Sequence, residues 1–184
     1  MKIKLLCCGM TLAWMLSVPA VAMTLSLLPD GQWYLFDVDK LASITGGLDW
    51  IDLSDEVLIF QVDLTQPALL EVVDGGFGGD RFEVFDKSIL LGTTSIASQT
   101  FPTSKALDFE AAYADPQWSQ ASFLLSPGNH QITGLLSTSA LDEAGNPLNA
   151  TVGAVRLMTV PEPTGWMLFI MGGGLLATWR HRSN

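Results

Sequence analysis

Cysteine and histidine are nearly absent from the chain, which has two of each in 184 residues. Both cysteines, Cys7 and Cys8, lie close to the N-terminus, so the rest of the chain has neither a disulfide nor a thiolate. Apart from His181 near the C-terminus, His130 is the one imidazole, too few for a transition-metal site. The H-E-x-x-H, G-x-S-x-G and P-loop motifs are also missing. We therefore predict that the protein is not an enzyme.

Basic residues are scarce as well. All 19 Asp and Glu residues lie between Asp30 and Glu162, where only five Lys and Arg residues occur, and five against nineteen gives a formal net charge of −14. A strongly acidic surface repels nucleic acid and favours solubility and divalent cations. We expect no nucleic-acid partner.

The N-terminal residues 1–22 have the parts of a secretory signal peptide. Two lysines precede an apolar stretch over residues 5–18, and Ala20 and Ala22 supply the small residues of an A-x-A cleavage site. The Sec export machinery and signal peptidase are the expected partners. The exported chain would begin near Met23.

The C-terminal residues 160–184 have three successive parts. They are the motif Pro161, Glu162 and Pro163, an apolar run over 164–179, and a basic end formed by Arg180, His181 and Arg182. Sixteen residues make a helix of roughly 24 Å, slightly short of the ~30 Å hydrocarbon core of a bilayer. We predict a short transmembrane helix whose basic end stays in the cytoplasm, so that the preceding domain faces outward.

The order of these three parts resembles the PEP-CTERM sorting signal of Gram-negative bacteria, which is processed by the membrane protease-transpeptidase exosortase. The resemblance implies an inner-membrane intermediate, cleavage at or near the motif, and delivery to the cell surface or the extracellular matrix, where exopolysaccharide is a candidate partner. The alternative is a retained membrane anchor in which the two prolines form a stiff linker.

Residues 23–159 are predicted to form one acidic β domain. The predicted strands are 32–36, 57–64, 68–73, 81–85, 89–94, 121–125, 130–136 and 151–158, and a short helix is expected over 107–114. Phe82 and Val84 alternate with Arg81 and Glu83, which predicts a strand with one buried face. Gly, Pro and Asp between the strands favour an antiparallel two-sheet sandwich with a jelly-roll-like arrangement.

A second resemblance lies in the centre of the chain, in Gly79 to Phe85, Leu91 to Thr94, Ala111 to Trp118, Phe123 to Leu125 and Pro127 to Thr133. These segments are similar to the β domain of a group of secreted proteins, many of which carry PEP-CTERM tails. The resemblance implies a shared extracellular sandwich and supplies no catalytic residues. In those proteins the hairpin turn usually contains Asn-Gly, whereas this chain has Asp86-Lys87-Ser88.

Two kinds of binding site are compatible with the sequence. Asp74 and Asp80 bracket four glycines, so their carboxylates and the exposed carbonyls could supply the oxygen ligands that Ca²⁺ prefers; Asp49, Asp52 and Asp55 form a second acidic loop. The structural alternative is that these aspartates cap turns. Trp33, Trp50 and Trp118 could form a stacking surface for sugar rings, although aromatic residues in small β domains are usually packed in the core.

Two classes of function follow. The first is a non-catalytic structural or adhesive component of the extracellular matrix, and it requires no cofactor. The second is a membrane-anchored module that binds carbohydrate or Ca²⁺.

Overall fold

The computed structural model describes residues 22–104 and 108–160. Within these two ranges the chain forms nine strands and one short helix. In chain order they are β1 (Met23–Ser26), β2 (Tyr34–Asp39), β3 (Leu58–Leu64), β4 (Ala68–Asp74), β5 (Arg81–Asp86), β6 (Ile89–Thr93), α1 (Phe109–Ala114), β7 (Gln120–Leu125), β8 (Gly128–Thr138) and β9 (Ala150–Thr159). The prediction of a mainly β domain is confirmed.

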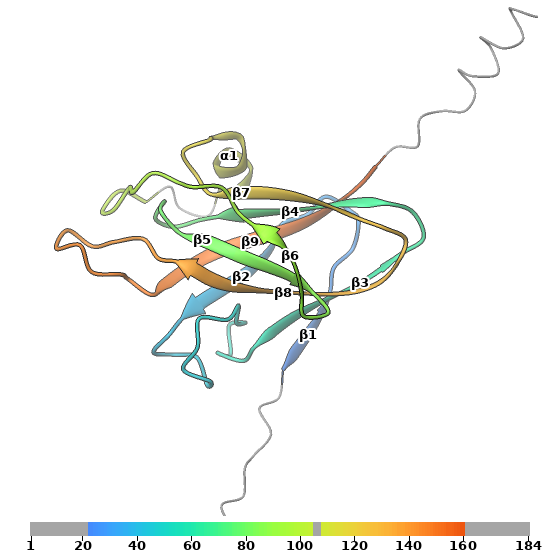
Figure 1. The fold of residues 1–184 in the computed structure, drawn as a ribbon, viewed down its shortest axis with the longest axis horizontal. Coiled ribbons are helices and arrows are strands. Elements are labelled where there is room, and N and C mark those ends of the chain that lie inside the picture. Colours follow the sequence, from blue (N-terminus) through green and yellow to red (C-terminus); the bar gives the residue numbers. More distant parts are fainter. Residues whose placement is uncertain (1–21, 105–107, 161–184) are drawn as a thin grey trace, which may run out of the picture.

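The strands form two sheets, with the orders β1-β3-β8-β5-β6 and β2-β9-β4-β7. Their pairings are antiparallel except for that of β1 with β3. The two sheets lie face to face, and α1 lies outside the four-stranded sheet (Figure 1). The prediction of an antiparallel-rich sandwich is confirmed. Among the described strands, only the β5–β6 connection stays within one sheet.

Aromatic side chains fill the space between the sheets. Phe36 stacks on Trp50 with ring centroids 3.9 Å apart, and Phe82 meets both rings edge-on. Trp50 comes from the segment between β2 and β3 and lies directly on the backbone of β8, because Gly134 has no side chain there. A Cβ at Gly134 would come within 2.0 Å of the indole. Phe82 and Val84 are both 0% exposed, as their alternation predicted.

A second, smaller core lies on the outer face of the four-stranded sheet. Phe109 of α1 packs there with Val73, Trp118 and Ala154. The helix begins after Asp108, whose side chain accepts a hydrogen bond from the backbone N–H of Ala111 and so caps the first turn. The helix therefore begins two residues later than the predicted range of 107–114 and ends at the same residue.

The β5–β6 hairpin has a two-residue turn made of Lys87 and Ser88. Both residues have positive φ, 48° and 67°, which is the geometry of a type I′ turn. Asp86 and Ile89 remain paired across the turn. The sequence therefore places two residues with side chains where Asn-Gly is usually found.

Candidate functional site

The glycine-rich loop of residues 75–80 passes from one sheet to the other. Asp74 is the last residue of β4 in the four-stranded sheet, and Asp80 directly precedes β5 in the five-stranded sheet. Gly76 and Gly79 have φ values of 68° and 126°, which side-chain-bearing residues rarely adopt. A Cβ at Gly79 would also come within 2.6 Å of the Gln99 amide. The glycines thus allow a tight passage between the sheets.

Strand alternation directs the Asp74 side chain into the sandwich. Asp74 lies on the same face of β4 as Leu70 and Val72, which belong to the core between the sheets. Asp74 and Asp80 are both 0% exposed. The structure therefore brings the two predicted ligands into one buried region at the end of the sandwich.

The hydrogen bonds of this pair are incomplete. Asp80 Oδ1 accepts from the backbone N–H of Ala140 at 2.7 Å, while Asp80 Oδ2 and both carboxyl oxygens of Asp74 are buried with no hydrogen-bond partner. The N–H groups of Gly75, Gly79 and Asp80 lie near the Asp74 carboxyl and lower its pKa, but none of them forms a hydrogen bond with it, and the Gly75 N–H donates instead to the Val152 carbonyl at 2.9 Å. Buried polar atoms without a partner are uncommon in folded proteins.

Burial changes the protonation chemistry of both groups. Burial, and next the charge of Asp80, raise the pKa of Asp74 to about 9. Burial also raises the pKa of Asp80 to about 6, against the lowering effects of the Thr151 hydroxyl and the Ala140 N–H. Among the described residues, no Lys, Arg or His forms an ion pair with either aspartate. The pair can therefore hold protons or a cation supplied from outside.

The second predicted acidic loop has a different role. Asp52 Oδ1 accepts from the backbone N–H groups of Ser54 and Glu56 at 2.8 and 3.1 Å, so it caps a turn. In the described ranges, no group of three or more His, Cys, Asp and Glu side chains is placed to hold a metal ion. For Asp52, the turn-capping interpretation is confirmed.

A hollow of about 350 Å³ with three aspartates in its lining lies beside the glycine-rich loop and was not predicted. Asp37, Asp39 and Asp55 line it together with Thr151 and the loop residue Phe77. Burial, followed by the charges of Asp55 and Asp39, raises the pKa of Asp37. The hollow is formed by β2, β9 and two loops, so no single sequence segment could have indicated it.

The predicted tryptophan surface is wrong. Trp50 is 0% exposed between the sheets and Trp118 is 1% exposed beneath α1, so neither ring can stack on a sugar. Trp33 is half-buried on the outer face, where the Arg156 guanidinium lies 4.3 Å from its ring centroid. Packing thus separates the three rings into different parts of the domain.

Arg156 connects α1 to the outer face of the four-stranded sheet. Its Nε donates to Glu71 at 2.6 Å, and its Nη1 donates to Glu110 of α1. Trp33 Nε1 donates to the same Glu110 carboxylate. These contacts fasten α1 to the sheet with side chains that sequence spacing could not connect.

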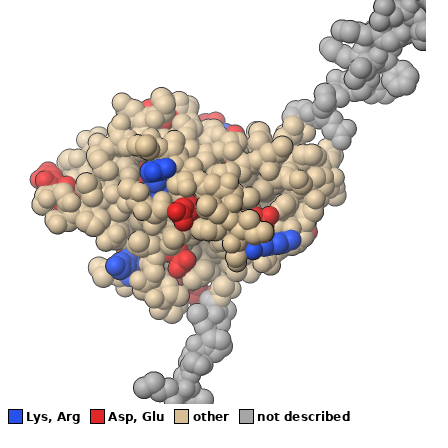
Figure 2. Space-filling view, viewed as in Figure 1, with Lys and Arg blue, Asp and Glu red and all other residues tan. Residues whose placement is uncertain are grey.

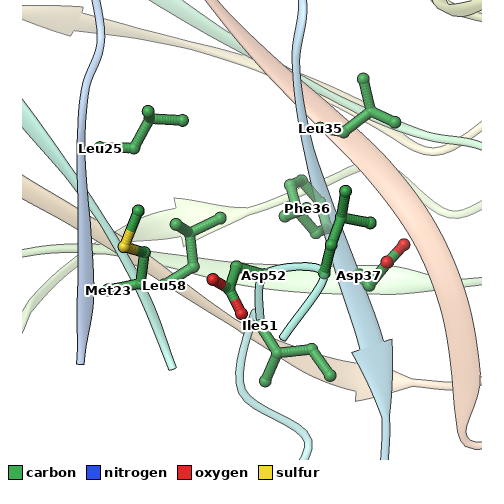
Figure 3. Close-up of a pocket in the computed structure, with 9 residues that line it drawn as sticks. Met23, Leu25, Leu35, Phe36, Asp37, Ile51, Asp52 and Leu58 are labelled. Carbon is green, nitrogen blue, oxygen red and sulfur yellow. The ribbon is translucent and has the colours of Figure 1, made fainter. Parts of the chain in front are cut away.

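An apolar groove of about 340 Å³ opens between the edge strands β1 and β2 (Figure 3). Met23 and Leu25 of β1 lie on one side and Leu35 of β2 on the other. Asp37 and Asp52 are the two acidic residues that line it. The groove has few hydrogen-bonding groups, and we assign no ligand to it.

The targeting residues lie mostly outside the described ranges. Ala20, the sorting motif Pro161–Pro163, the predicted helix over 164–179 and the basic end 180–182 are not described, whereas Ala22 directly precedes β1. Where the structure describes the chain, no helix has the length and apolar character needed to span a bilayer.

Comparison with known proteins gives little further information. No family model matches the chain, and no curated protein does. One similar solved structure is the pre-peptidase C-terminal domain of a collagenase from Bacillus anthracis, with 11% identity and a TM-score of 0.36, covering 77% of this chain and 98% of that one. Another is CorA, a surface-associated copper-binding protein important in copper acquisition by Methylomicrobium album BG8, with 9% identity and a TM-score of 0.39, covering 76% and 98%.

Proposed function

We propose that the chain is a non-catalytic exported protein of the cell surface or extracellular matrix in a Gram-negative bacterium. The observation that carries the proposal is the match between the domain ends and the two targeting segments. β1 begins at Met23, directly after the A-x-A site that ends at Ala22, and β9 ends at Thr159, two residues before Pro161. Both cuts would therefore leave the nine described strands complete.

The hydrogen bonds at the two ends support the same boundaries. The Met23 N–H donates to the Val57 carbonyl at 2.8 Å, and the Val160 N–H donates to the Pro67 carbonyl at 3.3 Å. The start of β1 and the end of β9 lie at opposite ends of the domain (Figure 1). The proposed cleavage sites of signal peptidase and exosortase would thus lie next to opposite ends of the domain.

The surface is consistent with a soluble exported domain. Figure 2 shows acidic and basic side chains separated by uncharged surface on one face, with no basic patch for nucleic acid. In the described part of the chain, His130 is the one histidine and no cysteine is present. This inventory favours a structural or adhesive role over catalysis.

The proposal also includes the finer features predicted from sequence. The predominance of connections between sheets favours a jelly-roll-like arrangement. Residues 164–179 would hold an inner-membrane intermediate until an exosortase acts at or near Pro161–Pro163. Exopolysaccharide remains a candidate partner, and because Trp50 and Trp118 are buried, any contact would involve other surface residues.

Mass spectrometry of the surface form from the source bacterium tests the processing. We expect an N-terminus at or near Met23 and no peptide beyond about Thr164. Glu162→Ala should cause the precursor to accumulate, while the control Glu143→Ala, in an exposed loop, should be processed normally. An intact Arg180–Arg182 end on the predominant surface form would instead establish a retained anchor.

A further inference from the structure

Three buried carboxyl oxygens lack a hydrogen-bond partner at the end of the sandwich. They are both oxygens of Asp74 and Oδ2 of Asp80, on two side chains that are 0% exposed. Leaving such groups unpaired in a protein interior is costly, and the cost is largest for ionised groups. Such oxygens take a bound proton, an ordered water or a bound cation as their partner.

Besides the backbone N–H groups of Gly75, Gly79 and Asp80, the neighbours of this pair include oxygen donors of the kind that hard cations prefer. The Thr151 hydroxyl interacts with Asp80, and the loop backbone between the two aspartates carries further carbonyl oxygens. The described residues contain no cysteine, and their one histidine, His130, is bonded to Asp86 and Ser126, which disfavours zinc and copper here. Two carboxylates also match the charge of one divalent cation, so a filled site would be neutral as a whole.

We infer that Asp74 and Asp80 bind one Ca²⁺ ion, with the Thr151 hydroxyl and loop carbonyls as further oxygen ligands. Ca²⁺ accepts six to eight oxygens in flexible geometry, whereas Mg²⁺ requires a nearly ideal octahedron and gives up its waters reluctantly. A loop of irregular backbone fits the first ion better. With only two carboxylates, the affinity should fall in the range of extracellular modules, a Kd of about 10⁻⁴ to 10⁻³ M.

The position of the site gives the ion a structural role. Asp74 ends β4, and its N–H donates to the Ser119 carbonyl at 2.9 Å, next to β7 in the same sheet. Asp80 directly precedes β5 in the other sheet. It accepts a hydrogen bond from the N–H of Ala140, which follows β8 in that same sheet. An ion bound by both carboxylates would connect the two sheets at the point where the chain crosses from one to the other.

Calcium titration of the full-length chain, purified in detergent and freed of metal with a chelator, tests this inference at pH 7.5. Calorimetry with CaCl₂ should give one ion per chain. At about one hundred times the Kd, calcium should raise the Tm by roughly 5 to 10 °C relative to EDTA. MgCl₂ at the same concentration should raise it less.

Matched variants locate the ion. Asp74→Asn and Asp80→Asn should each weaken calcium binding at least about tenfold, while Asp63→Asn removes the same charge from an exposed position and should bind as the unmodified chain does. Thr151→Val keeps both carboxyls and should weaken binding several-fold, so a result remains available if an aspartate variant fails to fold. The binding test does not depend on the export proposal.

Two outcomes would overturn the inference. If calcium leaves the Tm of the unmodified chain unchanged, the carboxyls share protons instead. If Asp74→Asn and Asp80→Asn respond to calcium as fully as Asp63→Asn does, the ion binds elsewhere on the acidic surface.

Discussion

His130 on β8 and Asp86 at the end of β5 form a hydrogen-bonded pair, with 2.7 Å between Nδ1 and Oδ2. The other ring nitrogen, Nε2, lies 2.9 Å from the Ser126 carbonyl oxygen, so both ring nitrogens face oxygen atoms. Asp86 Oδ1 accepts from the Gln131 N–H. The one histidine of the described domain therefore anchors the β5–β6 hairpin to β8.

Replacing this histidine should lower the stability of the domain. We expect His130→Ala to lower the free energy of unfolding by about 1 to 3 kcal/mol, because it leaves a largely buried Asp86 oxygen without its partner. Urea denaturation measures the loss. Asn129→Ala, which removes an exposed contact with Asp63, is the control and should cost less than about 1 kcal/mol. Equal losses for the two variants would contradict the anchoring role.

Stability without calcium should depend on pH in an unusual direction. The folded pKa values of Asp74 and Asp80, about 9 and about 6, both lie above 3.8, so the folded state retains protons that the unfolded state has released. Stability should therefore fall as pH rises from about 4, through pH 6 for Asp80 and toward pH 9 for Asp74, by up to about 1.4 kcal/mol per pH unit for each group.

Urea midpoints at pH 5, 7 and 8 in EDTA measure this dependence. Asp74→Asn should flatten the curve over the whole window and Asp80→Asn mainly below pH 6, whereas Asp63→Asn should leave it unchanged. With the calcium site that we infer, calcium should oppose the fall above pH 6, because it would bind the deprotonated pair. A stability that rises from pH 5 to 8 in all these variants would show that other acidic groups dominate.

The β5–β6 turn should be improvable by a single substitution. Ser88 has a φ of 67°, which costs an L-residue roughly 1 to 2 kcal/mol, whereas glycine adopts it freely. After the larger backbone entropy of glycine is subtracted, Ser88→Gly should raise stability by about 0.5 to 1 kcal/mol. Chemical denaturation measures the gain. Ser54→Gly, where φ is not positive, should give no gain.

Truncating the central aromatic cluster should be severe. Phe82 is 0% exposed and packs against Phe36 and Trp50, so Phe82→Ala should cost about 3 to 5 kcal/mol. Leu124→Ala, at a side chain that is 68% exposed, should cost less than about 1 kcal/mol.

Far-ultraviolet circular dichroism should be dominated by β structure, and a mainly helical spectrum would contradict the fold.

The longer strands were predictable because they carry regular patterns. Arg81 to Phe85 alternates, and β4 places Leu70, Val72 and Asp74 on one face. β1 has only four residues, Met23–Ser26, and gains its place by pairing with β3. Such a short segment has no period of its own, so sequence analysis missed it.

Sequence analysis predicted which residues form the candidate site but not that their side chains are buried. The spacing of Asp74 and Asp80 around four glycines indicated oxygen ligands, yet their burial depends on how two sheets close over the loop. The burial of Trp50 likewise depends on Gly134, a residue far along the chain. The burial of the two aspartates and of Trp50 thus depends on contacts between segments that are distant in the sequence. A local sequence pattern does not predict such contacts.

If the chain is exported as we propose, the position of β9 affects the order in which its strands can pair. β9 is the last strand to be made, but it lies inside its sheet, between β2 and β4. A chain that leaves the cell with its N-terminus first would therefore hold β2 unpaired in its sheet until residues up to Thr159 had emerged. By then the segment from Pro161 onward would be entering the membrane. The domain would thus close only when the proposed sorting tail reaches the membrane, so folding of the domain and exposure of the tail would occur at the same time.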